Sequence, residues 1–152
     1  MSDRVLRALL VGASLAGAAV AGYVLASRWA DSGLICSTGG CATVQSSEYA
    51  ELLGIPVAAF GLAGYLLIAV LVLGVSSAAR AATAALALGA AAFSLYLLVV
   101  QLAVIDAVCD WCVANDVVAS LVALLALARL LQPELSVGAQ SPRGSSSPSA
   151  SA

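Results

Sequence analysis

The stretch DAVCDWC, residues 106–112, separates two long apolar runs. The preceding run extends over about 81–105 and the following run over about 111–131. A helix that crosses a bilayer needs about 20 apolar residues, so each run is long enough to span one. We therefore expect this stretch to connect two membrane-spanning helices.

The same stretch carries Cys109 and Cys112, two of the four cysteines of the chain. Two thiols separated by two residues at the start of a helix can close a small disulfide and reopen it. The positive end of the helix dipole favours the thiolate of the first cysteine. The spacing therefore indicates redox chemistry at a membrane surface.

The composition of the 152 residues is typical of a membrane protein. Hydrophobic residues make up 62% and charged residues 9%, whereas soluble domains carry about a quarter charged residues. The mean hydropathy is +1.08. The chain has no histidine, which excludes His-ligated haem, Cys–His catalysis and most zinc enzyme sites. A net charge of −2 without a basic patch does not indicate nucleic-acid binding.

Two further apolar runs lead us to predict an all-α membrane protein with a bundle of four transmembrane helices. These runs cover about 8–26 and about 57–75. A cleaved signal peptide is the alternative for the first run, although the apolar cores of such peptides are usually about 7–15 residues long. We expect residues 1–132 to form the transmembrane redox domain. Residues 133–152, rich in Ser, Gly and Pro, are expected to be a disordered cytoplasmic tail.

The polar segment 27–55 is expected to form an outer loop that holds the other two cysteines, Cys36 and Cys41. Its second part, about 44–53, has the pattern of a short helix. Ser47 is a plausible N-cap, and an apolar side would let this helix lie along the membrane interface. The loop thus places a second cysteine pair at the same membrane surface.

The arginines predict the orientation of the bundle. Only Arg28 falls on the side of the cysteines, whereas the other basic residues fall on the side of the termini. Positively charged residues favour the cytoplasmic side. We therefore expect cytoplasmic termini and extracytoplasmic cysteines in a bacterial inner membrane, where the periplasmic side permits disulfides. The basic residues on the side of the termini are Arg4, Arg7, Arg80, Arg129 and Arg143.

The two cysteine pairs allow three interpretations: an electron relay, two structural disulfides, or a four-thiolate metal site. Extracytoplasmic thiolates tend to oxidise, which disfavours the metal site. A Cys-x-x-Cys bridge closes too small a loop to stabilise a fold by much. We therefore favour the relay, which needs a lipid-soluble electron partner, and a quinone fits this requirement.

The order of motifs resembles the vitamin K epoxide reductase family, in its bacterial single-domain form without a fused thioredoxin domain. The resemblance covers about residues 8–131. A loop cysteine pair is followed by a Val-x-x-Ser-x-Tyr motif, Gly-Ile-Pro, Phe-Gly, a tyrosine and the Cys-x-x-Cys pair at the start of the last span. These motifs correspond to Cys36, Cys41, Val44, Ser47, Tyr49, Gly54, Ile55, Pro56, Phe60, Gly61, Tyr65, Cys109 and Cys112.

The resemblance implies a four-helix bundle around a quinone, either menaquinone or ubiquinone, and no metal. It also implies a separate periplasmic thioredoxin-fold partner that donates electrons. Cys36 would meet this partner, Cys41 would exchange with Cys109, and Cys112 would contact the quinone. The implied activity is that of a thiol oxidoreductase with a quinone acceptor, which supports disulfide bond formation.

The resemblance also implies two residues near the quinone. Ser47 occupies the position of the family's loop serine, near the active-site disulfide, and Phe60 would help to wall the quinone pocket. The alternatives are that Ser47 is only an N-cap and that Phe60 only packs in the core.

The chain departs from the vertebrate members of the family at two positions. These members have a tyrosine four residues after the second active-site cysteine, where this chain has Asp116, and an asparagine where it has Val57. Both departures argue against epoxide reduction. An acid inside a span is a functional candidate, so we expect Asp116 to hydrogen-bond the quinone or relay a proton. The alternative is an acid that snorkels near the start of its helix.

Two rival assignments remain. The four-span family of the disulfide-bond-forming protein B type performs the same chemistry, but there the Cys-x-x-Cys pair precedes the loop pair in the chain, which is the reverse of the order here. A non-enzymatic membrane subunit with structural disulfides is the alternative from another functional class.

Overall fold

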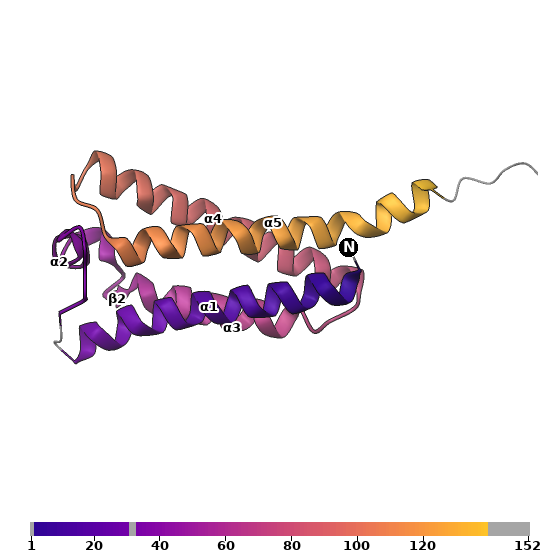
Figure 1. Ribbon diagram of the computed structural model, residues 1–152, viewed down its shortest axis with the longest axis horizontal. Helices are drawn as coiled ribbons and strands as arrows, with labels where there is room; N and C mark the ends of the chain where they lie inside the picture. The colour runs from indigo at the N-terminus through magenta and orange to yellow at the C-terminus, as the bar shows by residue number, and fades with distance from the viewer. Residues whose placement is uncertain (1, 31–32, 140–152) are drawn as a thin grey trace, which may run out of the picture.

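The computed structural model describes residues 2–30 and 33–139, with side chains described to Gln132. Most of the chain is helical, and four helices lie side by side along one direction (Figure 1). The elements are α1 (Asp3–Trp29), α2 (Cys41–Gln45), the 3-10 helix η1 (Glu48–Ala50), β1 (Glu51–Leu52), β2 (Ile55–Pro56), α3 (Val57–Leu71), α4 (Ser77–Ala103) and α5 (Asp110–Ala139).

The bundle is built by α1, α3, α4 and α5. Helix α1 packs against α3 and α5, and α4 packs against α5 and α3. The short elements gather at one end of the bundle, and the N-terminus lies at the other (Figure 1). We call the end with Cys36, Cys41, Cys109 and Cys112 the cysteine end, and the end with Arg7, Arg80 and Arg129 the arginine end.

Three of the four bundle helices are long and apolar enough to cross a membrane. They cover Asp3–Trp29, Ser77–Ala103 and Asp110–Gln132. Helix α3 is apolar but has only 15 residues, which corresponds to about 22 Å of helix against about 30 Å of hydrocarbon. The structure is therefore that of a membrane helical bundle with three long helices and one shorter helix.

Capping explains why α4 begins earlier than the apolar run in the sequence predicts. The Ser76 side chain accepts a hydrogen bond from the Ala79 N–H, so α4 begins at Ser77 rather than near residue 81. The turn before it is tight, since a Cβ on Gly74 would lie 2.6 Å from the Ala79 Cβ. The residues of this turn are also apolar, so the hydrophobic pattern of the sequence does not reveal that α3 ends at Leu71.

The predicted helix over 44–53 is wrong. Helix α2 ends at Gln45, Ser47 has an extended backbone, and β1 and β2 form an antiparallel hairpin. Both residues of the hairpin turn have positive φ, 56° for Leu53 and 78° for Gly54, as type I′ turns require. The segment is therefore divided among the end of α2, η1 and the first strand of the hairpin, and does not form one helix.

Towards the C-terminus, helix α5 continues beyond residue 132, the expected boundary of the bundle domain. Residues 133–139 of the expected tail belong to α5. The remaining residues of that tail, 140–152, lie outside the described residues.

The core uses small residues to bring helices close together. A Cβ on Gly17 of α1 would lie 2.5 Å from the Tyr65 ring of α3, so only glycine permits this contact. The rest of the main cluster is aliphatic and rich in alanine. Its buried members are Leu10, Ala18, Tyr65, Ile68, Val72, Ala84, Ala87, Val122, Ala123 and Ala126.

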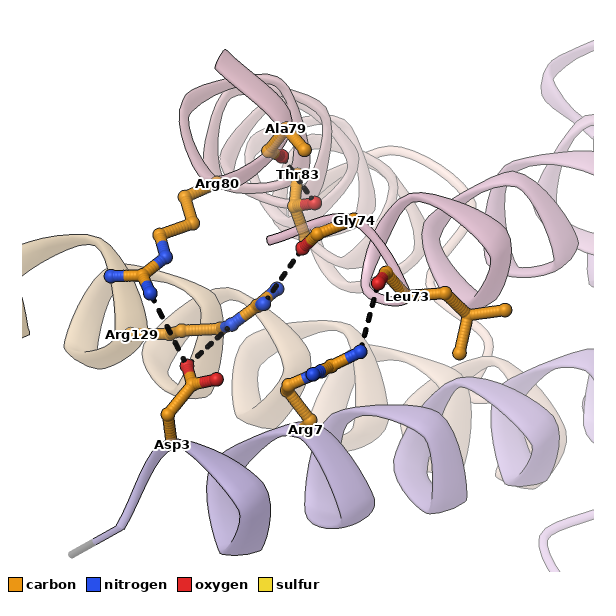
Figure 2. Close-up of polar contacts among 8 residues, drawn as sticks. All are labelled: Asp3, Arg7, Leu73, Gly74, Ala79, Arg80, Thr83 and Arg129. Atoms are coloured by element: carbon orange, nitrogen blue, oxygen red, sulfur yellow. Dashed lines mark hydrogen bonds and ion pairs between the residues drawn. The ribbon is translucent and has the colours of Figure 1, made fainter. Parts of the chain in front are cut away.

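The arginine end is fastened by Arg129, whose side chain is only 1% exposed. Its Nε donates to the Asp3 carboxylate at 3.0 Å and an Nη to the Gly74 carbonyl at 2.9 Å (Figure 2). Arg80 lies 3.9 Å from the same carboxylate oxygen, and Arg7 donates to the Leu73 carbonyl at 2.8 Å. These contacts join the start of α1, the turn after α3, and helices α4 and α5.

The Asp3→Asn variant is expected to unfold more easily, because it leaves the buried charge of Arg129 without its carboxylate. Breaking a fully buried ion pair costs about 3–5 kcal/mol. Since Asp3 is one-third exposed, we expect about 2 kcal/mol here. Thermal unfolding in detergent measures the change. Arg4→Gln, which removes one charge at an exposed neighbouring position, is the control, and an equal effect of both variants would contradict a specific role for Asp3.

Candidate active site

The four cysteines meet at the cysteine end. Cys36 and Cys41 form a disulfide, with their Cα atoms 6.0 Å apart. Cys109 and Cys112 are free thiols, and the Cys112 thiol donates to the Cys109 sulfur at 2.7 Å. Cys41 and Cys109 lie with Val44 in one buried cluster, with Cys36 and Cys112 at its edge. The structure thus brings together two pairs that are far apart in the sequence.

Glycines allow the loop between Cys36 and Cys41 to lie against the start of α5. Gly39 has a φ of 76°, in the region that favours glycine. Gly40 is needed for space, since a Cβ there would lie 2.4 Å from the Val108 carbonyl oxygen. The backbone of the loop therefore packs directly on the residue before Cys109.

Trp111 holds the other side of this contact. Its indole N–H donates to the Ile35 carbonyl at 2.8 Å, and its ring centroid lies 4.5 Å from that of Tyr23. The residue thus connects the loop, the end of α1 and the start of α5.

The surroundings of Cys109 favour its thiolate. The hydrogen bond from the Cys112 thiol lowers the pKa of Cys109 to about 7, with further help from the Cys112 backbone N–H and the Gln45 amide. Burial acts in the opposite direction, and the hydrogen bonds outweigh it. A thiolate at neutral pH is the form that performs thiol–disulfide exchange.

A cavity of about 400 Å³ begins beside Cys112 and extends between the helices. Its lining is mostly apolar, which suits a lipid-soluble ring. The residues that the sequence suggested for a quinone site all line this cavity. They are Ser47, Phe60, Cys112 and Asp116.

The Ser47 side chain does not act as an N-cap, and Phe60 does not pack in the core. The Ser47 hydroxyl donates to the Val44 carbonyl at 2.7 Å and makes no cap hydrogen bond to η1. Phe60 is 44% exposed, so it is not a core residue. Both side chains are therefore positioned at the cavity wall.

A polar network faces the cavity from α3, α4 and α5. The Tyr65 hydroxyl donates to the Asn115 side-chain oxygen at 3.0 Å, and the Ser94 hydroxyl donates to one oxygen of Asp116. The other Asp116 oxygen is buried and has no hydrogen-bond partner among the described residues. Asp116 therefore offers a free acceptor inside an apolar cavity.

Sequence reasoning missed two glutamines that contact the Cys-x-x-Cys pair. The Gln45 side chain donates to the Cys112 sulfur at 3.7 Å, and the buried Gln101 side chain accepts from the Cys109 N–H at 3.2 Å. Gln101 is an isolated amide inside an apolar run, a signal that could have singled it out. Gln45 gave no such signal, because its segment was assigned to the wrong element.

A metal site of four thiolates would need all four sulfurs reduced. Cys36 and Cys41 lie with Asp110 in a cluster whose ligand atoms are within 4.8 Å of one another. In this structure the two sulfurs are joined in the disulfide, so neither is a thiolate that could bind a metal ion.

The lowered pKa of Cys109 predicts a thiolate that is present above about pH 7 and protonated below it. Ultraviolet absorbance of the thiolate, followed against pH with the loop disulfide closed, should therefore show a step near pH 7. The step should be absent in Cys109→Ser. It should move to higher pH in Cys112→Ala, which lacks the main hydrogen-bond donor; a step that does not move would contradict this cause.

Comparison with known families supports an oxidoreductase. The sequence model of the vitamin K epoxide reductase family matches residues 8–127, which include all four cysteines. The chain matches no individual curated protein closely. Members of the family are oxidoreductases that act on disulfides and quinones, and they generally work with thioredoxin-like partners. On the strength of a match over most of its length, the chain belongs to the vitamin K epoxide reductase family.

Proposed function

We propose that this protein oxidises the thiols of a separate periplasmic thioredoxin-fold protein and passes the electrons to a membrane quinone. Electrons would enter at Cys36 and Cys41 and leave through Cys109 and Cys112. The observation that carries this proposal is the placement of the two cysteine pairs in one cluster, with Cys112 at the wall of an apolar cavity. This activity would supply oxidising power for disulfide bond formation.

The exposure of the loop cysteines supports the order of transfer. Cys41 is 1% exposed and shares its cluster with fully buried Cys109, whereas Cys36 is only partly buried. A partner protein can therefore reach Cys36 more easily than Cys41. Attack of the partner's thiolate on Cys36 would form a mixed disulfide with the partner, break the loop disulfide and release the Cys41 thiolate on the side of Cys109. The second thiolate of the partner would then break the mixed disulfide, which leaves the partner oxidised and Cys36 as a thiolate.

Exchange between the pairs then follows ordinary disulfide chemistry. The Cys41 thiolate attacks Cys109 in its disulfide with Cys112, and Cys112 leaves with the electron pair. Its thiolate forms at the wall of the cavity, next to the Gln45 amide. A bound quinone would act as the acceptor of two electrons and two protons.

The cavity fits the ring of a menaquinone or ubiquinone. Its volume of about 400 Å³ lies within the range of small-molecule sites, about 300–1,000 Å³. Phe60 would pack against the ring, Ser47 would lie on the side of the loop, and Asp116 would hydrogen-bond an oxygen of the ring or carry a proton to it. The unpartnered oxygen of Asp116 supports this role.

The charge distribution supports a cytoplasmic location for both termini and an extracytoplasmic location for the cysteines. Arg7, Arg80 and Arg129 gather at the arginine end, where α1 begins, and α2 lies at the opposite end of the bundle (Figure 1). Positively charged residues favour the cytoplasmic side of a bacterial inner membrane. The cysteine end would then lie in the periplasm, where disulfides persist.

Two residues support a quinone rather than an epoxide as the acceptor. Asp116 occupies the position at which vertebrate members of the family have a substrate-contacting tyrosine, and Val57 that of an asparagine. Both residues line the cavity. We therefore propose thiol oxidation as the activity of this chain.

The proposed function predicts rapid loss of free thiols when quinone is added without oxygen to the fully reduced, detergent-solubilised protein. Maleimide labelling counts the remaining thiols. Cys112→Ala should abolish the quinone-dependent loss, because it removes the sulfur at the cavity wall. Four thiols that stay free in the wild type after quinone addition would contradict the proposed function and favour a membrane subunit with structural disulfides.

Asp116→Asn is expected to slow quinone reduction by about tenfold or more, since a positioned acid or base contributes about 10²–10⁴-fold to proton transfer. The amide has the size of the carboxyl group and can still accept the Ser94 hydrogen bond. Leu88→Met, at an exposed apolar position of α4 outside the cavity lining, is the control. A wild-type rate in Asp116→Asn would show that this carboxylate has no role in the transfer.

A further inference from the structure

Asp110, between the two cysteines of the Cys-x-x-Cys pair, binds the loop that carries the other pair. One oxygen of its carboxylate accepts hydrogen bonds from the Ser37 N–H at 2.6 Å, the Ser37 hydroxyl at 2.6 Å and the Thr38 N–H at 3.4 Å. Both donor residues lie between Cys36 and Cys41. Exchange between two thiol pairs does not itself require an acid at this position, so the contact calls for another explanation.

Hydrogen bonds between neutral groups also join the loop to the residues on either side of Asp110. Together with the contacts of Asp110 they form one docking surface between the loop and the start of α5. The Thr38 hydroxyl donates to the Val108 carbonyl at 2.6 Å, and the Trp111 indole donates to the Ile35 carbonyl at 2.8 Å. Residues 35–40 therefore lie along residues 108–111. Asp110 contributes the charge-assisted hydrogen bonds of this surface, and such bonds are roughly twice as strong as neutral ones.

Docking decides which loop sulfur lies beside Cys109. Oxygen and sulfur atoms of Asp110, Cys36 and Cys41 lie within 4.8 Å of one another, so the carboxylate is close to both loop sulfurs. On this anchored loop Cys41 is buried in the cluster of Cys109, and Cys36 remains partly exposed. Without this anchor only the neutral contacts would hold the loop, and the position of the Cys41 sulfur beside the Cys-x-x-Cys pair would be less fixed.

We propose that Asp110 is a positioning residue that anchors the loop so that the Cys41 sulfur is presented to Cys109. This inference rests on the proposed function and assigns a role within the exchange between the pairs. In that step a Cys41–Cys109 bond forms and the Cys109–Cys112 bond breaks. The Cys36 thiolate then attacks Cys41 and releases Cys109, so the loop loses two electrons and the second pair gains two. Asp110 exchanges neither electrons nor protons.

The equilibrium constant of the Cys41–Cys109 disulfide tests this role directly. The full-length protein with Cys36→Ser and Cys112→Ala retains only these two thiols, and glutathione buffers of known composition set the redox conditions in detergent. Asp110→Ala is expected to lower the equilibrium constant by about tenfold, because several hydrogen bonds to the loop are lost. Asp110→Asn should lower it by about threefold, since an amide oxygen still accepts but carries no charge.

Two controls separate positioning from a general loss of stability or charge. The Cys36–Cys41 disulfide, measured in a Cys109→Ala, Cys112→Ala background, closes within the loop and should change less than about twofold in Asp110→Ala. Asp106→Asn removes a carboxylate three residues from Cys109 that makes no hydrogen bond to the described part of the loop. It should leave the Cys41–Cys109 equilibrium within about twofold of the background value.

A double-mutant cycle identifies the contact itself. Ser37→Ala should weaken the Cys41–Cys109 disulfide on its own and cause little further loss in the presence of Asp110→Ala. Fully additive losses, an unchanged equilibrium in Asp110→Ala, or equal losses in both disulfides would each overturn the positioning role. Because no quinone is present, these outcomes are independent of the thiol-trapping test and do not bear on the proposed function.

Discussion

The docking of the loop on the start of α5 is the contact on which the proposed exchange between the cysteine pairs depends. Sulfurs that are far apart in the chain can exchange only if one approaches the other along the line of the bond that breaks. A few close contacts join the two segments that carry the sulfurs: a glycine that lets the backbone approach residue 108 closely, an indole hydrogen bond, and the carboxylate of Asp110. The helices of the bundle hold the start of α5, and with it the docked loop, in place.

The two ends of the bundle use charge differently. At the arginine end, the buried guanidinium of Arg129 binds a carboxylate and the backbone, and together with Arg80 it joins the ends of four helices. At the cysteine end, hydrogen bonds converge on sulfur atoms and favour an anionic thiolate at Cys109. The cavity between the ends is apolar, with Asp116 as an exception at its wall. The arginine end therefore has a structural role, and the reactive groups lie at the cysteine end.

Sequence reasoning predicted the features that depend on long patterns. Apolar runs indicated the bundle helices, the two cysteine pairs indicated a redox site, and the family resemblance was confirmed. It was wrong over residues 44–53, where positive φ angles at Leu53 and Gly54 decide for a hairpin. It could not find the contact of Gln45 with Cys112, because that contact depends on how α2 packs against α5 and leaves no local pattern.

The shortness of α3 has a consequence for the surrounding lipid. Its 15 residues correspond to about 22 Å of helix, against about 30 Å of hydrocarbon, and the tight turn that follows contains the carbonyls of Leu73 and Gly74. Arg7 and Arg129 donate hydrogen bonds to these carbonyls through their guanidinium groups, so the turn at the end of the short helix is held by side chains. A bilayer accommodates such hydrophobic mismatch by thinning locally. Lipid beside α3 would therefore be compressed, and this protein would be sensitive to the acyl chain length of the membrane in which it resides.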